Sequence, residues 1–180
     1  MGKTMRKKKR ATIIIICIVG AILVWNHLPY YYKNEKTVEY ITIHAGKDSR
    51  CMCAGYVIRS MWNGGCPIGL VPAYAYNKVL PQMGFEEISV NGYKPMRGDI
   101  SVVPSNKKHP FGHIAIYNGK QWVSDFKQGG EMLPSKAYRA NGKYQIFRIE
   151  DGWHWKHVWT TPIDWYGWIQ SVVKWSINKK

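Results

Sequence analysis

Cysteine is scarce in this chain of 180 residues, which contains only four. That number excludes the small disulfide-rich domains, in which disulfide bonds replace a large hydrophobic core. The sequence also lacks internal repeats and low-complexity runs. Hydrophobic residues make up 46% of the chain and aromatic residues 14%, a composition that excludes a disordered charged tail. Because a domain usually has roughly 100–200 residues, the length predicts one domain with short appendages.

Acidic residues are also few, since 11 Asp and Glu stand against 26 Lys and Arg and give a formal net charge of +15. Six of the basic residues lie within the first ten positions, and the remaining 20 against 11 still leave a net charge of +9. Such a charge favours a polyanionic surface as substrate or partner. No run of Lys and Arg alternates with aromatic side chains as in a nucleic-acid groove, so we expect no nucleic acid as a partner.

An uncharged segment near the N-terminus is the basis for predicting where in the cell the protein lies. Fifteen residues without a charge, Ala11–Trp25, follow the basic segment 1–10, and this length fits a signal-peptide core or a short membrane span. No small-x-small cleavage site follows, and Trp25 with Tyr30–Tyr32 is typical of the aromatic belt at a membrane interface. We therefore predict an uncleaved transmembrane signal anchor over residues 11–32, with segment 1–10 in the cytoplasm. The chain is then a single-pass protein of the cytoplasmic membrane, with everything after the anchor on the extracytoplasmic side.

The rest of the sequence changes from helical to extended patterns. An apolar stripe at helical spacing before Gly64-Gly65 predicts a helix over Arg50–Asn63, and Pro72–Leu80 carries the signals of a second helix. Thr37–Ala45 fits either a helix or a strand. Short alternating segments predict four strands, over Asp99–Val103, His113–Tyr117, Gln121–Phe126 and Tyr144–Ile149. Helices followed by an antiparallel sheet predict the α+β class.

Two residues in this layout point to thiol chemistry. Cys53 lies near the first turn of its predicted helix, where unpaired N–H groups and the helix dipole favour a thiolate. His113 begins a predicted strand directly after Gly112. A nucleophilic thiol and a nearby imidazole base are the groups that acyl transfer requires. A third side chain must orient the imidazole, and Asp125 on the next predicted strand is the natural acid.

The length of the turn after Tyr117 decides which side chain lies opposite His113. A strict two-residue turn puts Ser124 there, whereas a one-residue bulge puts Asp125 there. Gln128 is a further polar candidate. The spacing leaves these alternatives open.

Three segments together resemble the CHAP and NlpC/P60 cysteine peptidases: Cys53-Ala54-Gly55-Tyr56-Val57, Gly98-Asp99-Ile100 and Gly112-His113-Ile114-Ala115-Ile116-Tyr117. These families are papain-like enzymes that cut amide bonds in peptidoglycan. The segment Gly112–Gln128 is similar to the bacterial peptidoglycan amidase branch, in which secreted effectors occur. The resemblance covers roughly residues 37–149.

The resemblance implies a papain-like fold, with helices packed on a small antiparallel sheet. It also implies Cys53 as the nucleophile, His113 as the base, and an acidic or amide residue as the third member, which we assign to Asp125. Cys51 departs from the family pattern, but the C-A-x-Y-V context belongs to Cys53. Peptidoglycan is the implied substrate.

The other cysteines allow two further arrangements. A disulfide between Cys51 and Cys66 would close a loop of about fifteen residues and leave Cys53 free. A metal site can be drawn from these three cysteines and His44, but Cys-x-Cys is not the usual spacing of a zinc knuckle. We therefore expect no metal and no other cofactor.

The tail, residues 150–180, lies beyond the resemblance. Thr161-Pro162-Ile163-Asp164 has the signals of a helix start, and the Trp-rich amphipathic pattern that follows predicts a helix lying on the membrane surface. The predicted organisation is thus segment 1–10, anchor 11–32, a cysteine amidase or peptidase domain over 37–149, and the tail. The predicted function is a membrane-anchored hydrolase of peptidoglycan amide bonds. The alternative is a non-catalytic, membrane-anchored wall-binding or assembly module that retains the fold.

Overall fold

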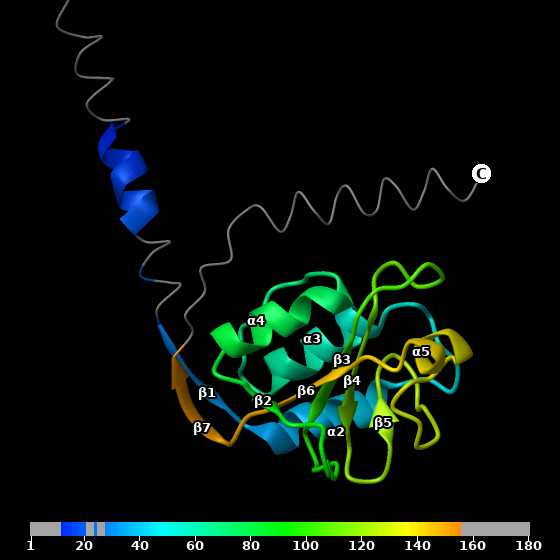
Figure 1. Cartoon of the computed structure of the whole chain (residues 1–180). Helices are drawn as coiled ribbons and strands as arrows, with labels where there is room; N and C mark the ends of the chain where they lie inside the picture. The colour runs from blue at the N-terminus through cyan, green and yellow to red at the C-terminus, as the bar shows by residue number, and fades with distance from the viewer. Residues whose placement is uncertain (1–11, 21–23, 25–27, 156–180) are drawn as a thin grey trace, which may run out of the picture.

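A five-stranded antiparallel sheet forms the centre of the protein (Figure 1). The computed structural model describes residues 12–20, 24 and 28–155. In the sheet the strand order is β2-β6-β3-β4-β5, and every neighbouring pair runs antiparallel. The strands are β2 (Glu86–Ile88), β3 (Ile100–Val103), β4 (His113–Tyr117), β5 (Trp122–Val123) and β6 (Gln145–Arg148). The predicted α+β class with an antiparallel sheet is therefore found.

Two helices pack on each other and on β4, and they hold the core together. They are α2 (Asn34–His44) and α3 (Cys53–Asn63). Val57, Ile58 and Met61 of α3 are buried, so the predicted apolar stripe does face the core. Gly65, with φ of +95°, follows α3, and a Cβ atom there would lie 2.2 Å from the carbonyl oxygen of Tyr31. Only glycine fits this turn, which fixes where α3 ends.

Shorter elements complete the domain. The 3₁₀ turn η1 (Ala73–Ala75) continues into α4 (Tyr76–Gln82), close to the predicted Pro72–Leu80 helix. The ambiguous segment Thr37–Ala45 is helical, as part of α2. A helix that the sequence analysis did not predict, α5 (Lys136–Asn141), begins at Ser135, whose side chain accepts a hydrogen bond from the Tyr138 N–H.

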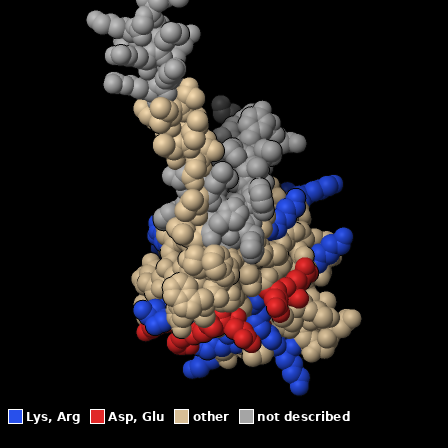
Figure 2. Space-filling model, turned by 90° about the vertical axis from the view of Figure 1, so that its left-hand side faces the viewer, with Lys and Arg blue, Asp and Glu red and all other residues tan. Residues whose placement is uncertain are grey.

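The three consecutive tyrosines do not form an aromatic belt. They belong to strand β1 (Pro29–Tyr32), which pairs antiparallel with β7 (Gly152–Trp155), outside the expected range 37–149. Because side chains alternate along a strand, Tyr32 is fully buried and Tyr31 remains 44% exposed. Tyr32 meets Phe85 edge to face, at 5.8 Å between ring centres. On this side of the protein, Figure 2 shows a band of acidic side chains with basic side chains beside it.

The predicted transmembrane helix must be corrected. Within the described part of the chain, no helix is long and apolar enough to span a membrane. The assignment as a single-pass protein of the cytoplasmic membrane is therefore not supported. Segment 1–10 and the predicted helix near residues 161–177 lie outside the described residues.

The turn between β4 and β5 differs from both predicted registers. Tyr117 pairs with Trp122, so four residues form the turn. The side-chain oxygen of Asn118 accepts hydrogen bonds from the N–H groups of Lys120 and Gln121, at 3.0 and 2.9 Å. This local bonding makes a longer turn favourable. After Val123 the chain folds back and bridges to Lys127, so neither Ser124 nor Asp125 continues the strand opposite His113.

Candidate active site

Cys53 is the first residue of α3, directly after a loop that a buried carboxylate holds in place. The Asp125 Oδ2 atom accepts hydrogen bonds from the backbone N–H groups of Arg50 and Met52, at 2.6 and 3.1 Å. The Ser49 hydroxyl donates to the same oxygen at 3.3 Å. Burial makes each of these bonds costly to lose, so Asp125 fixes the path of the chain into α3.

The Cys53 thiol lies where α3 meets β4. Burial raises the pKa of the Cys53 thiol to about 11, and the charges of Asp125 and Cys51 raise it further. The backbone at Ile114 and Ala54 acts in the opposite direction and lowers the pKa. The resting thiol is therefore protonated at neutral pH, although the sequence position at a helix N-terminus had favoured a thiolate.

His113 precedes Ile114 at the start of β4 and is only 6% exposed. Burial lowers the pKa of its imidazole to about 4. The charge of Asp125 acts in the opposite direction, and His109 lowers the pKa further. His113 is therefore neutral at pH 7 and can accept a proton.

The side chain that contacts the His113 ring is Gln128. Its amide nitrogen lies 2.6 Å from His113 Nε2 and 3.2 Å from Ser124 Oγ. Gln128 is buried, and its Oε1 atom has no hydrogen-bond partner. Because Gln128 occupies Nε2, the other ring nitrogen, Nδ1, is the one available to a thiol.

Asp125 has other partners than the imidazole. Beyond its bonds to the loop at residues 49–52, its Oδ1 atom accepts a hydrogen bond from Ser124 Oγ at 3.1 Å. Of the three candidates that the sequence left open, Gln128 is thus the one in hydrogen-bond contact with His113. The signal that could have found it is Asn118, whose turn-forming side chain lengthens the hairpin and sets its register.

A cavity of about 320 Å³ brings the predicted site residues together, since Cys53, His113 and Asp125 all line it. His109 and Tyr138 form another part of its wall and stack on each other, with ring centres 4.4 Å apart. The Tyr138 hydroxyl donates to the carbonyl oxygen of Gly112, at 2.7 Å. The strand start that carries His113 is thereby tied to α5.

A second cavity of about 320 Å³ adjoins the first and is mostly apolar. Cys51, Cys53 and Phe111 line both cavities, while Met52, Leu70, Val71 and Pro72 line the second one alone. Cys53 therefore belongs to the wall that the two cavities share.

Neither of the two arrangements considered for the other cysteines is found among the described residues. Cys51 is exposed while Cys66 is buried in the core, and no disulfide joins them. Over the described residues, no group of three or more His, Cys, Asp or Glu side chains is placed to hold a metal ion.

Comparisons with known proteins find similar chains among solved structures. No family model matches the sequence, and no curated protein matches it. A chain in the native type VI effector–immunity complex Tae3–Tai3 from Ralstonia pickettii is similar in structure, with a TM-score of 0.58 and 31% identity. The similarity covers 66% of this chain and 100% of that one.

The selenomethionine form of the same Ralstonia pickettii complex gives a TM-score of 0.57 and 33% identity, over 62% of this chain and 98% of that one. Neither complex is described as a CHAP or NlpC/P60 protein. In both complexes the chain that resembles this protein is the Tae3 effector. With this level of identity over their whole length, the chain belongs to the Tae3 family of type VI effectors.

Proposed function

We propose that this protein is a cysteine amidase or endopeptidase that hydrolyses amide bonds of bacterial peptidoglycan. One observation carries the proposal: Cys53 at the start of α3 and His113 at the start of β4 line the same cavity. Membership of the Tae3 effector family supports it. The excess of basic residues suits a wall polymer rich in carboxylates.

The charge states of the two groups define the first step. Because the thiol and the imidazole are both neutral at rest, His113 takes the proton as the Cys53 sulfur attacks the amide carbonyl. The carbon–sulfur bond forms, and the resulting imidazolium returns the proton to the departing amine as the carbon–nitrogen bond breaks. Water, deprotonated by His113, then hydrolyses the thioester and regenerates the thiol.

Gln128 acts as the positioning residue of the base. If the Gln128 amide is turned by 180°, its Oε1 atom faces the His113 ring and accepts a hydrogen bond from the His113 Nε2–H group. The Gln128 oxygen then has the hydrogen-bond partner that it otherwise lacks. That tautomer leaves Nδ1 unprotonated and ready for the thiol proton. An amide in this place fits the acidic or amide residue that the sequence resemblance implied.

Asp125 has two effects in this mechanism. It holds the loop at residues 49–52, which sets the start of α3 and hence the position of Cys53. Its charge also raises the pKa of His113, so it stabilises the imidazolium that forms during attack. The backbone N–H groups at the start of α3, that of Cys53 first, are suited to hold the developing oxyanion.

The test is release of fragments from purified peptidoglycan sacculi by the full chain, identified by mass spectrometry. We expect soluble muropeptides from the wild type, none from Cys53→Ala, and nearly wild-type release from Cys51→Ala. Cys51 is the matched control because it lines the same cavities. Equal loss in both folded variants contradicts the assignment of Cys53. Binding of sacculi without release by the wild type would favour the alternative of a non-catalytic wall-binding module.

A further inference from the structure

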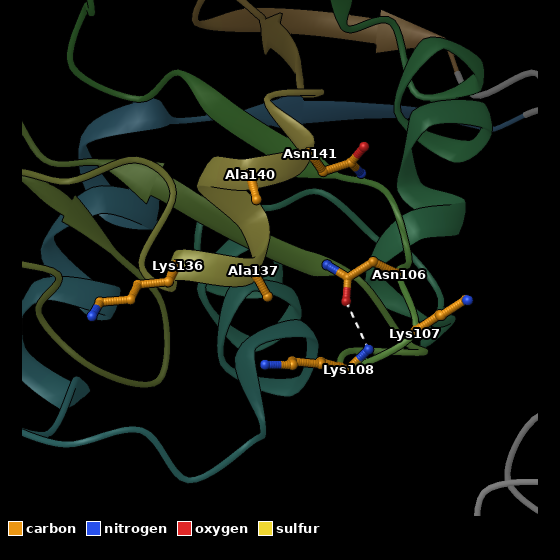
Figure 3. A pocket seen from close by; sticks show the side chains of 7 residues that line it. All are labelled: Asn106, Lys107, Lys108, Lys136, Ala137, Ala140 and Asn141. Atoms are coloured by element: carbon orange, nitrogen blue, oxygen red, sulfur yellow. Dashed lines mark hydrogen bonds between the residues drawn. The ribbon is translucent and has the colours of Figure 1, made fainter.

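A third cavity adjoins the Cys53 cleft, and three of its seven lining residues are lysines (Figure 3). Its volume is about 510 Å³, and it lies between the loop at residues 106–108 and helix α5. Its basic residues are Lys107, Lys108 and Lys136. We call it the lysine pocket. In the view of Figure 3, Lys107 and Lys136 lie at opposite edges of the pocket with their amines directed outward, and Lys108 extends below Ala137.

The positive charge of the lysine pocket is not neutralised by acidic neighbours. Within residues 28–155, the ion pairs of the structure all use arginine: Arg97 with Glu35, Arg139 with Glu131 and Arg148 with Asp99. Lysines that surround a hollow without an acidic partner create a positive potential inside it. An anionic ligand is the natural counterpart.

Asn106 supplies a hydrogen-bond donor in the same wall. Its Oδ1 atom accepts hydrogen bonds from the N–H groups of Lys108 and His109, at 3.0 and 2.9 Å. These two bonds fix the orientation of the amide, and Figure 3 shows its nitrogen on the side of α5. This Nδ2 atom is buried and has no acceptor. The amide is therefore a donor within the pocket wall that has no acceptor among the described residues.

Lys108 connects the lysine pocket with the reactive thiol, because it lines both this pocket and the cavity of Cys53 and His113. A ligand that extends from one cavity into the other would place its anionic group among the lysines and a carbonyl near the sulfur. The stem peptides of peptidoglycan carry free carboxylates a few bonds away from their amide links.

We propose that the lysine pocket is a substrate subsite that binds a carboxylate of the stem peptide while the scissile amide lies at Cys53. This inference rests on the proposed function and adds to it a determinant of specificity. Lys108 and Lys136 attract the carboxylate, and the pocket selects substrates whose acidic group is unmodified. Amidation of that group removes the charge and with it the attraction.

The experiment compares two triple variants of the full chain that lose the same charge. The pocket variant is Lys107→Gln with Lys108→Gln and Lys136→Gln. The control variant replaces Lys78, Lys94 and Lys120, which are exposed and outside the lining of the pocket, by Gln. Each is assayed on a stem peptide with free carboxylates and on the same peptide with its carboxylates amidated.

We expect the wild type to prefer the free carboxylates. The pocket variant should raise KM for that peptide by about tenfold, change kcat little, and lose the preference. The control variant should behave as the wild type. If KM rises equally in the pocket variant and the control variant, the lysines attract the peptide only through the net charge of the protein. If the pocket variant raises KM equally for the free and the amidated peptide, the substitutions have distorted the cleft. Either result overturns the proposal, as does an unchanged KM.

Binding separates this proposal from the proposed function. In the Cys53→Ala chain, calorimetric titration with each peptide measures affinity without turnover. We expect tighter binding of the free-carboxylate peptide, and loss of that difference when the three pocket lysines are also replaced. Equal affinity for the two peptides overturns the subsite even if the wild type cleaves both. A clear difference supports the subsite even if hydrolysis proves to depend on another residue.

Discussion

At the scale of single residues, burial has the largest effect on the chemistry of the site. It moves the pKa values of Cys53 and His113 in opposite directions, to about 11 and about 4. A thiolate–imidazolium ion pair is therefore disfavoured before substrate arrives. In the proposed mechanism the proton therefore moves only when attack begins, and the rate depends on how well the neutral imidazole is oriented.

The pH dependence of activity tests this description. Protonation of His113 removes the base, so we expect kcat/KM for a soluble stem peptide to stay level from pH 7 to about pH 5 and to fall only near pH 4, well below the ordinary histidine value of about 6.5. Asp125→Asn removes a charge that raises the pKa of His113 and should move the acid limb to lower pH. An acid limb near 6.5 in the wild type contradicts a buried, neutral imidazole.

Gln128 gives a second prediction at this scale. Gln128→Ala leaves the imidazole free to turn, so we expect kcat to fall about 10- to 100-fold with little change in KM. Gln128→Glu places a negative charge against Nε2 and should move the acid limb of the pH profile upward. Gln145→Ala on β6 is the matched control, because its amide bonds Glu87 at 3.0 Å, and it should keep full activity. If the activity of Gln128→Ala falls only in proportion to the amount of folded protein, Gln128 has a structural role alone.

At the scale of elements, the loop at residues 49–52 and helix α3 depend on one carboxylate. Asp125 is fully buried and accepts two backbone N–H groups of this loop. Asp125→Ala leaves both donors unsatisfied, and we expect the free energy of unfolding to fall by about 3 kcal/mol. Asp48→Ala, on an exposed side chain of the same loop region, should change it by less than about 0.5 kcal/mol.

Chemical denaturation with urea measures both variants. A fall in stability as small for Asp125→Ala as for Asp48→Ala would show that the loop is held by other contacts. Equal loss of activity in both variants, without loss of stability, would contradict the role given to Asp125 in positioning Cys53.

The elements also show how far the sequence could be interpreted. The periodicity of the residues in α3, and the alternation of those in β3, β4 and β6, are local properties, so their segments were predicted close to their final bounds. Strand register is different, because a single side-chain interaction can decide it. The Asn118 side chain lengthens one turn and thereby brings Gln128, rather than Asp125, to His113. That choice depends on the folded hairpin and not on spacing.

At the scale of the whole molecule, the pairing of β1 with β7 was the least predictable feature. Three tyrosines after an apolar run match the composition of a membrane interface, and β7 lies more than a hundred residues away. Only the tertiary structure shows that Tyr30 and Tyr32 enter the core while Tyr31 faces outward. Composition therefore assigned these aromatic side chains to the wrong environment.

This pairing can be tested by two neighbouring substitutions. Tyr32→Ala removes a fully buried ring, so we expect the free energy of unfolding to fall by about 3–5 kcal/mol. Tyr31→Ala removes an exposed ring that meets Trp153 edge to face and should cost about 1 kcal/mol or less. Thermal melting followed by circular dichroism measures both. Similar losses for the two variants would mean that the strand does not alternate as described.

The β1–β7 pair also determines how the protein can be attached to something else. Pro29 lies opposite Trp155, so the chain enters and leaves the domain at one place. Figure 1 shows α5, whose Tyr138 lines the cleft, at the opposite end of the domain. A carrier or reporter protein fused before β1 or after β7 would therefore be held far from the cleft and leave it open to a large polymer. The same adjacency makes residues 29 and 155 suitable ends to join for a circular permutant.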